Sequence, residues 1–199
     1  MRAVKYGATR DYVRAMKVVL PTGEITDFGA TVSKTSSGYS LLNLMIGSEG
    51  TLGIITELTL KTMPAPKLVA SLIIPFENLD DCISAVPKFK MEHMNPQALE
   101  FMEREIVLSS ERYIGKSVFP QVIDGVTANA YLLVTIDAGN EDELNNLIEE
   151  ASEIVLEAGA IDVLVADTPA KIKDAWAARS SFLEAIMAEK KLLDECDVV

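Results

Sequence analysis

The chain has 199 residues, of which 49% are hydrophobic, and a formal net charge of -12. This length and hydrophobic content suffice for one good core or two small ones. So acidic a chain repels nucleic acid and anionic membrane surfaces, and no apolar run is long enough to span a bilayer, so neither partner is expected. Cys82 and Cys196 follow no metal-ligand spacing, so we expect them to be reduced, buried thiols. The residues after Met1 do not resemble a signal peptide, so we expect a cytoplasmic protein.

The first third of the chain predicts a small sheet with a glycine-rich turn. Strands are expected over residues 14–20, 25–28 and 53–63, and a short helix over 41–46. Residues 47–53 read Gly-Ser-Glu-Gly-Thr-Leu-Gly. This turn either merely needs positive φ angles or lets backbone amides approach a flat or charged group, and the spacing alone leaves both interpretations open. It is no Walker A loop, because Gly-Lys-Ser/Thr is missing, and no Rossmann fingerprint, because the glycines precede a strand.

Residues 64–66 read Pro-Ala-Pro, which cannot continue a strand ladder and predicts a boundary between a domain at 1–64 and another at 67–199. The second part predicts strands at 68–74, 98–102, 130–136 and 161–166, with helices at 79–89, 103–111, 141–158 and from 169 onward. Strand–helix–strand repeated twice predicts a ferredoxin-like α+β domain. Such a domain has a four-stranded antiparallel sheet with helices on one face.

One charge stands in the apolar stripe of the last predicted helix. Arg179 follows Trp176 by one turn and shares its face with Ile172, Leu183 and Ile186. A buried guanidinium needs an anion, which is either a nearby Asp or Glu or the carboxylate of a ligand. The single histidine, His93, has no partner for a metal site or a catalytic pair, and the residues alone assemble no catalytic constellation.

The glycine motif, continued as Gly-Thr-Leu-Gly-Ile-Ile-Thr, resembles the signature of flavoproteins with the vanillyl-alcohol-oxidase-type FAD fold. The likeness is greatest to the FAD-linked 2-hydroxy-acid oxidases and dehydrogenases of the glycolate oxidase and D-lactate dehydrogenase type. Residues 2–7, 18–24, 98–102 and 176–179 are similar to that family as well, so that the resemblance covers nearly the whole chain. It implies the C-terminal part of an FAD-binding domain followed by a ferredoxin-like cap, or substrate, domain.

The resemblance also implies roles for individual residues. FAD contacts, mostly through the backbone, are expected at Glu49, Gly50, Thr51, Leu52, Gly53, Ile54 and Ile55, with Tyr6 and Gly7 as weaker neighbours of the cofactor. Arg179 matches an arginine that holds the substrate carboxylate in relatives that oxidise D-2-hydroxy acids. The family's pyrophosphate-binding loop is expected upstream of Met1 and its histidine and metal region downstream of Val199, which makes the chain an internal fragment with no catalytic residue or metal of its own.

The implied activity is oxidation of a D-lactate- or glycolate-class 2-hydroxy acid to the 2-oxo acid, by hydride transfer to FAD. Electrons would pass to an electron-transfer flavoprotein, an iron–sulfur subunit or a quinone. Two alternatives remain open. An alkyl-dihydroxyacetonephosphate-synthase-type flavoenzyme shares the glycine signature, and a non-catalytic ferredoxin-like binding module would explain the second domain.

Overall fold

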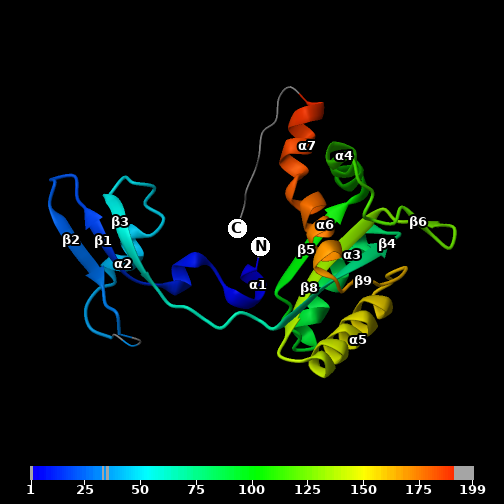
Figure 1. Cartoon of the computed structure of the whole chain (residues 1–199), viewed down its shortest axis with the longest axis horizontal. Helices are drawn as coiled ribbons and strands as arrows, with labels where there is room; N and C mark the ends of the chain where they lie inside the picture. Colours follow the sequence, from blue (N-terminus) through cyan, green and yellow to red (C-terminus); the bar gives the residue numbers. More distant parts are fainter. Residues whose placement is uncertain (1, 33, 35, 191–199) are drawn as a thin grey trace. The chain divides into compact units, whose positions relative to one another are not determined.

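The chain folds into two compact units, each with its own hydrophobic core (Figure 1). The computed structural model describes residues 2–32, 34 and 36–190. Gly7–Ala65 forms the smaller unit, and the described parts of Met1–Tyr6 and Pro66–Val199 form the larger one. The chain leaves the smaller unit within the Pro-Ala-Pro segment. Residues 2–6, which the sequence places with the first domain, group with the larger unit.

The smaller unit is a three-stranded antiparallel sheet with β1 in the centre. Its elements are η1 (Thr9–Tyr12), β1 (Val13–Val19), β2 (Ile25–Gly29), α2 (Leu41–Met45) and β3 (Ile54–Leu60). Only four of its described hydrophobic side chains are buried, namely Val13, Met16, Val18 and Met45. This core is small because α2, which has only five residues, covers a single patch of the central strand β1.

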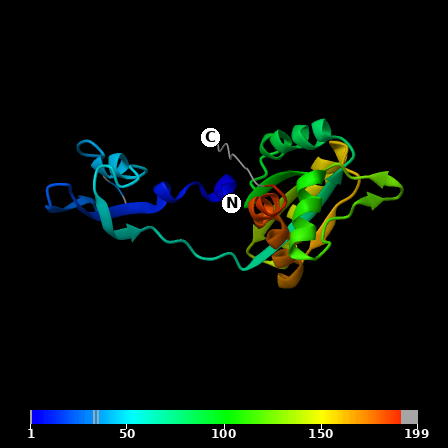
Figure 2. The same cartoon turned by 90° about the horizontal axis from the view of Figure 1, so that it is seen from above.

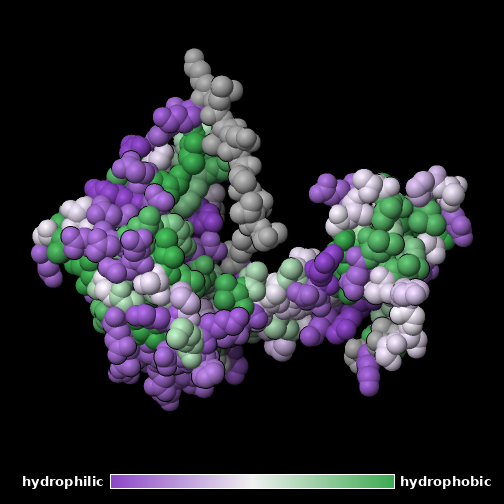
Figure 3. Space-filling model, turned by 180° about the vertical axis from the view of Figure 1, so that it is seen from behind, coloured by the Kyte–Doolittle hydropathy of each residue, from purple (hydrophilic) through white to green (hydrophobic). Residues whose placement is uncertain are grey.

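Strand β3 is exposed on both of its faces. All seven of its residues are solvent-exposed, and Ile54, Ile55, Leu58 and Leu60 are each at least 40% accessible. Hydrophobic atoms accordingly gather on the surface of this unit (Figure 3). An exposed apolar area of this kind marks an interaction surface in soluble proteins.

The larger unit contains a four-stranded antiparallel sheet in the order β5-β8-β4-β9. Its strands are β4 (Leu68–Phe76), β5 (Ala98–Glu103), β8 (Ala130–Ala138) and β9 (Leu164–Ala166), with a small hairpin of β6 (Val122–Ile123) and β7 (Val126–Thr127). Its helices are α1 (Ala3–Tyr6), α3 (Leu79–Met91), α4 (Arg104–Ile114), α5 (Glu141–Glu157), α6 (Pro169–Ser180) and α7 (Phe182–Glu189). This strand order confirms the predicted ferredoxin-like arrangement.

The two central strands, β4 and β8, are buried on both faces. On one face Leu72 and Val134 point into a core closed by α3 and α5, as the ferredoxin-like pattern predicts. This core also encloses Cys82, which is fully buried and whose pKa is raised to about 12 by that burial, so its thiol is inert. Cys196 lies outside the described residues.

The second face of the sheet is covered as well, by α4 and α6 (Figure 2). The sequence predicts one long helix after Pro169, but the helix breaks at Ser181 into α6 and α7. The hydroxyls of Ser110 and Ser181 donate to the carbonyl of Ala178 at 2.5 and 3.0 Å. That carbonyl is therefore occupied by side chains, which favours a break in the helix. Because of the break, Leu183 does not lie on the buried stripe where the sequence places it, and it is 40% exposed to solvent.

The short helix α1 is held on the larger unit by a buried carboxylate. Asp137, whose side chain is 3% exposed, accepts hydrogen bonds from the ammonium of Lys5, the hydroxyl of Tyr6 and, at 3.3 Å, Gln97. Burial alone would raise the pKa of Asp137, but the bonds from Lys5 and Tyr6 outweigh burial and hold that pKa below its ordinary value. Residues more than 130 positions apart are thereby joined at one point.

Asp137→Asn should destabilise the protein by about 1–3 kcal/mol, because it leaves the Lys5 ammonium without its anion. The folded-state pKa of Asp137 is depressed, so its stabilisation is present above the ordinary Asp pKa of about 3.9 and is lost as the pH falls through the folded value. Urea unfolding at pH 7 and at acidic pH measures this, and the difference between variant and wild type should shrink in acid.

The matched control is Asp167→Asn. Asp167 pairs with Lys171 on the surface, with both side chains more than 60% exposed, so its loss should be nearly neutral. Equal destabilisation by the two variants would show that the Asp137 cluster is no anchor.

Candidate functional site

The buried polar side chains of the described residues lie on one side of the larger sheet. Four stand on the face of the sheet itself or beside it, namely Ser71, Gln97, Thr135 and Asp137. Four more lie in the helices that cover this face, namely Ser109, Ser110, Glu111 and Ser181. Buried polar groups are costly unless they are hydrogen-bonded, so this face of the sheet and the helices over it must supply partners to one another.

A hydroxyl pair bridged by an indole marks the centre of this polar face. Ser71 and Thr135 are directly opposite each other on β4 and β8, and their hydroxyl oxygens lie 2.8 Å apart. The indole N–H of Trp176, from α6, points at both, at 3.4 and 3.2 Å. These bonds fix the orientation of α6 over the sheet, and hence the position of Arg179 one turn later.

The guanidinium of Arg179 forms an ion pair with Glu100 of strand β5. Its Nε and Nη2 atoms both donate to Oε2 of Glu100, at 3.1 and 2.8 Å. The pair is half-sheltered, with the Arg179 side chain 32% and the Glu100 side chain 11% exposed. Among the described residues, Nη1 of Arg179 has no hydrogen-bond partner. The guanidinium is thus oriented by Glu100 with one nitrogen left to receive a second anion.

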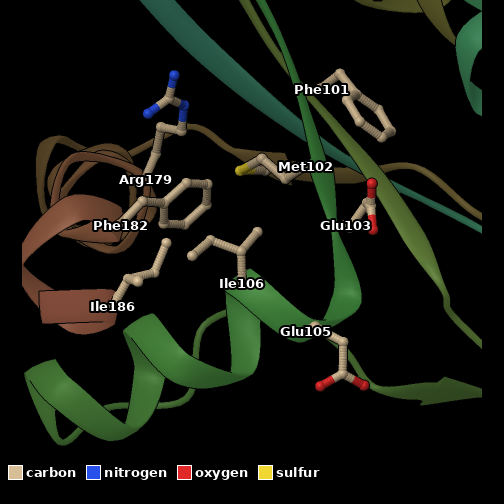
Figure 4. Close-up of a pocket in the computed structure, with 8 residues that line it drawn as sticks. All are labelled: Phe101, Met102, Glu103, Glu105, Ile106, Arg179, Phe182 and Ile186. Atoms are coloured by element: carbon tan, nitrogen blue, oxygen red, sulfur yellow. The ribbon is translucent and has the colours of Figure 1, made fainter. Parts of the chain in front are cut away.

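Arg179 lies at one end of a cavity of about 360 Å³ (Figure 4). The apolar wall of the cavity consists of Phe101, Met102, Ile106, Phe182 and Ile186. The guanidinium carbon lies 5.1 Å from the centre of the Phe182 ring, within the range of a cation–π contact. The remaining lining residues, Glu103 and Glu105, stand on the side away from Arg179 (Figure 4). The cavity therefore combines one cation with an apolar wall and an acidic edge.

In the smaller unit, the glycine-rich turn borders a shallow cavity of about 270 Å³. Gly47 and Gly50 adopt positive φ angles of 83° and 79°, and Glu49 does so as well at 51°. A Cβ at Gly47 would meet no atom within 4 Å, and one at Gly50 only Ile54 Cδ1 at 4.0 Å. The backbone here faces open space, so a planar or anionic group could approach its amides.

Gly53 is a glycine for a different reason. Its φ is not positive, but a Cβ would lie 2.7 Å from Val18 Cγ1 and 2.9 Å from the carbonyl oxygen of Val19. Gly53 therefore allows the start of β3 to pack directly against β1. Its role in this structure is internal packing of the small core.

Tyr6 and Gly7 are likewise engaged in local structure. The Tyr6 hydroxyl donates to Asp137, and this bond, together with burial, raises the pKa of Tyr6. Gly7 has a φ of 75°, and a Cβ there would lie 2.5 Å from the Asp11 carboxylate that accepts the amide of Ala8. Gly7 thus permits a tight turn at the point where the chain enters the smaller unit.

Residues 65–199 match the family of FAD linked oxidases, C-terminal domain. The chain belongs to this family. The match covers the ferredoxin-like sheet and the helices from α3 to α7, so the FAD-linked oxidase C-terminal domain carries Arg179, Glu100 and the cavity.

Relatives are similar over the whole chain. The chain is 71% identical over 199 residues to a D-lactate dehydrogenase of Anaerostipes hadrus, covering 100% of this chain and 42% of that protein. It is 35% identical over 202 residues to a D-lactate dehydrogenase of Archaeoglobus fulgidus, covering 98% and 42%. It is 34% identical to the glycolate oxidase subunit GlcD of Bacillus subtilis, covering 94% and 38%. The chain thus spans about two fifths of the length of these curated relatives.

Solved flavoenzymes share the fold. An alkyldihydroxyacetonephosphate synthase superposes with a TM-score of 0.67 at 20% identity, over 93% of this chain and 34% of that one. A 4-ethylphenol oxidase of Gulosibacter chungangensis superposes with a TM-score of 0.65 at 18% identity, over 90% and 39%. At these identities the likeness concerns the fold alone, and it supports the predicted α+β architecture.

The FAD-linked oxidase domain and the glycine turn each hold part of the predicted site. Glu49 to Ile55 form one continuous turn and strand start, whereas Arg179 and Tyr6 belong to the other unit. The sequence reasoning missed Glu100, although an acid between Ala98 and Met102 on the inward face of a strand is a signal that could have revealed it. It also missed Asp137, which follows the buried apolar residues of β8. By the alternation of side chains along a strand, Asp137 lies on the same face of the sheet as Thr135.

Two further features concern metals and membranes. Within the described residues, no group of three or more His, Cys, Asp or Glu side chains could hold a metal ion. A search of the same residues finds no helix with the length and apolar character needed to cross a membrane.

Gly53→Ala should cost more than Gly47→Ala, although both lie in the same turn. The new methyl group at residue 53 would collide with the β1 backbone, which costs about 1–3 kcal/mol. At residue 47 the cost is only that of a positive φ, about 1 kcal/mol. Amide exchange in residues 7–65 of each variant measures the loss, and a larger loss for Gly47→Ala would contradict the packing role of Gly53.

Proposed function

We propose that the protein containing this chain is an FAD-dependent 2-hydroxy-acid dehydrogenase. Its substrate would be of the D-lactate or glycolate class, and its product the 2-oxo acid. The observation that carries the proposal is the geometry of Arg179. Its guanidinium is oriented by Glu100, keeps one nitrogen without a partner in the described part of the chain, and stands at a cavity in a domain of the FAD-linked oxidase family. The 71% identity to a D-lactate dehydrogenase supports the same conclusion.

Arg179 would bind the substrate carboxylate through Nη1. Glu100 would keep the guanidinium plane fixed through Nε and Nη2, so that little side-chain freedom is lost when the acid binds. Because Glu100 also compensates part of the positive charge, Arg179 would contribute mainly geometry to recognition. The α-carbon of the acid would then be held in a defined place for oxidation.

The glycine turn is proposed as one wall of the FAD site. Its residues fit this role because Gly47 and Gly50 offer bare backbone beside an open cavity, with Met45, Ile54 and Ile55 as apolar neighbours. Bound FAD would supply the acceptor for the hydride. Glu49 to Ile55 would contact it mainly through main-chain amides, whereas Tyr6 and Gly7, being engaged locally, would be peripheral.

The smaller unit is proposed to be the C-terminal part of an FAD-binding domain. Its exposed strand β3 supports this, since a strand with seven exposed residues and several large apolar side chains needs a cover. The rest of that domain would supply the cover. Residues 67–199 would then form the substrate-side cap domain.

Electrons removed from the substrate must leave the flavin. We propose an electron-transfer flavoprotein or an iron–sulfur subunit as acceptor, in the cytoplasm. The inert, reduced thiol of Cys82 is compatible with that compartment.

The full-length protein should purify with bound flavin, and D-lactate or glycolate should bleach the flavin absorbance and reduce an artificial electron-acceptor dye. A protein with flavin that no 2-hydroxy acid reduces would favour the alkyl-dihydroxyacetonephosphate-synthase type. A protein without flavin would favour a binding module. Either result would contradict the proposed activity.

Arg179→Lys in the full-length protein should lower kcat/KM for the hydroxy acid by about tenfold to a hundredfold, because Lys keeps the charge but loses the planar geometry. The matched control is Arg112→Lys, since Arg112 forms an exposed pair with Glu189 on α7, 63% and 41% accessible, and its kcat/KM should be unchanged. If Arg179→Lys lowers the melting temperature and leaves kcat/KM intact, the Arg179–Glu100 pair is purely structural.

A further inference from the structure

The open cavity beside Arg179 is much larger than the methyl group of lactate. Its volume of about 360 Å³ lies within the range of pockets that hold whole small-molecule ligands. Five of its eight lining residues are hydrophobic, and two of those are phenylalanines. The carboxylate and hydroxyl of any 2-hydroxy acid are the same, so the side chain on the α-carbon is what this wall would distinguish.

The charges at the cavity have a defined arrangement. Among the described residues of the lining, Arg179 is the one cation, and Glu103 and Glu105 are the other charged groups. If Arg179 holds the α-carboxylate, a second carboxylate on the substrate would meet apolar side chains and two acids. A dicarboxylic hydroxy acid would then lose hydration without gaining a partner.

We propose that the cavity is the side-chain pocket of the enzyme, and that its preferred substrates are 2-hydroxy acids with a branched or aromatic apolar side chain. This inference rests on the proposed function and goes beyond it by naming the substrate's side chain. Ile106, Phe182 and Ile186 lie together on one side of the pocket, and Phe182 stands beside Arg179 (Figure 4). Each is half-buried, so each can lose further water contact when an apolar side chain enters.

The test is a comparison of kcat/KM for three substrates with the full-length flavoprotein and an artificial acceptor dye. The substrates are D-lactate, D-2-hydroxy-4-methylpentanoate and D-2-hydroxyglutarate. We expect the branched acid to exceed D-lactate by about tenfold or more, since one extra methylene in an apolar pocket changes kcat/KM by about 10–200-fold at most. We expect D-2-hydroxyglutarate to lie about a hundredfold or more below the branched acid.

A variant pair tests the location of the pocket. Ile106→Arg places a second cation in the wall, and it should lower kcat/KM for the branched acid about tenfold while raising that for D-2-hydroxyglutarate. The matched control is Ile83→Arg, the same change on helix α3 at a residue that is 51% exposed on the opposite side of the sheet. It should leave all three values unchanged.

The outcomes separate the two proposals. Oxidation of D-lactate with no advantage for the branched acid, or with D-2-hydroxyglutarate as the best substrate, overturns the side-chain pocket and leaves the proposed function standing. An equal change for all three substrates in Ile106→Arg also overturns it. Failure of every 2-hydroxy acid to reduce the dye overturns both. The wild-type ranking decides the question even if Ile106→Arg does not fold.

Discussion

Nine consecutive residue pairs join β4 to β8, and the rest of the larger unit depends on this ladder. Both strands are buried on both faces, so alternate residues must face two separate layers of helices. One set, which includes Leu72 and Val134, is apolar and packs against α3 and α5. The other set contains Ser71, Thr135 and Asp137, whose polar atoms need partners brought by the second layer. The positions of Trp176 on α6 and of Lys5 and Tyr6 on α1 follow from that need.

The polar face thus does two kinds of work with similar groups. Asp137 accepts hydrogen bonds from three donors and holds α1 on the sheet. Glu100 is different, because one of its oxygens takes two donors from Arg179, and the third nitrogen of that guanidinium has no partner among the residues that the structure describes. A buried carboxylate whose donors all come from the protein stabilises the fold, whereas an ion pair with an open donor can also bind a ligand. This difference in satisfaction, more than the presence of charge, separates the anchor from the candidate site.

Much of the larger unit could be predicted from the sequence because its signals are periodic. The buried strands, the capped helix at Asn140 and the Thr-Pro start of α6 all lie where local pattern and chemistry place them. The break at Ser181 could not be predicted in this way, since it depends on a hydroxyl from Ser110, 71 residues away. The partner of Arg179 could not be predicted for the same reason, because Glu100 lies 79 residues away in the sequence. The sequence shows that a guanidinium needs an anion, but only the fold determines that the anion is Glu100.

Within the glycine turn, the sequence alone could not distinguish the roles of the individual glycines. Gly47, Gly50 and Gly53 are equally spaced and look equivalent, yet two of them satisfy a positive φ beside open space and the third satisfies a close contact with β1. The open end of this turn keeps its place because its other end, at Gly53, is packed against β1. The packing glycine and the open glycines therefore act together: Gly53 fixes the start of β3 against β1, and that fixed start leaves Gly47 and Gly50 facing open space, where the FAD wall is proposed.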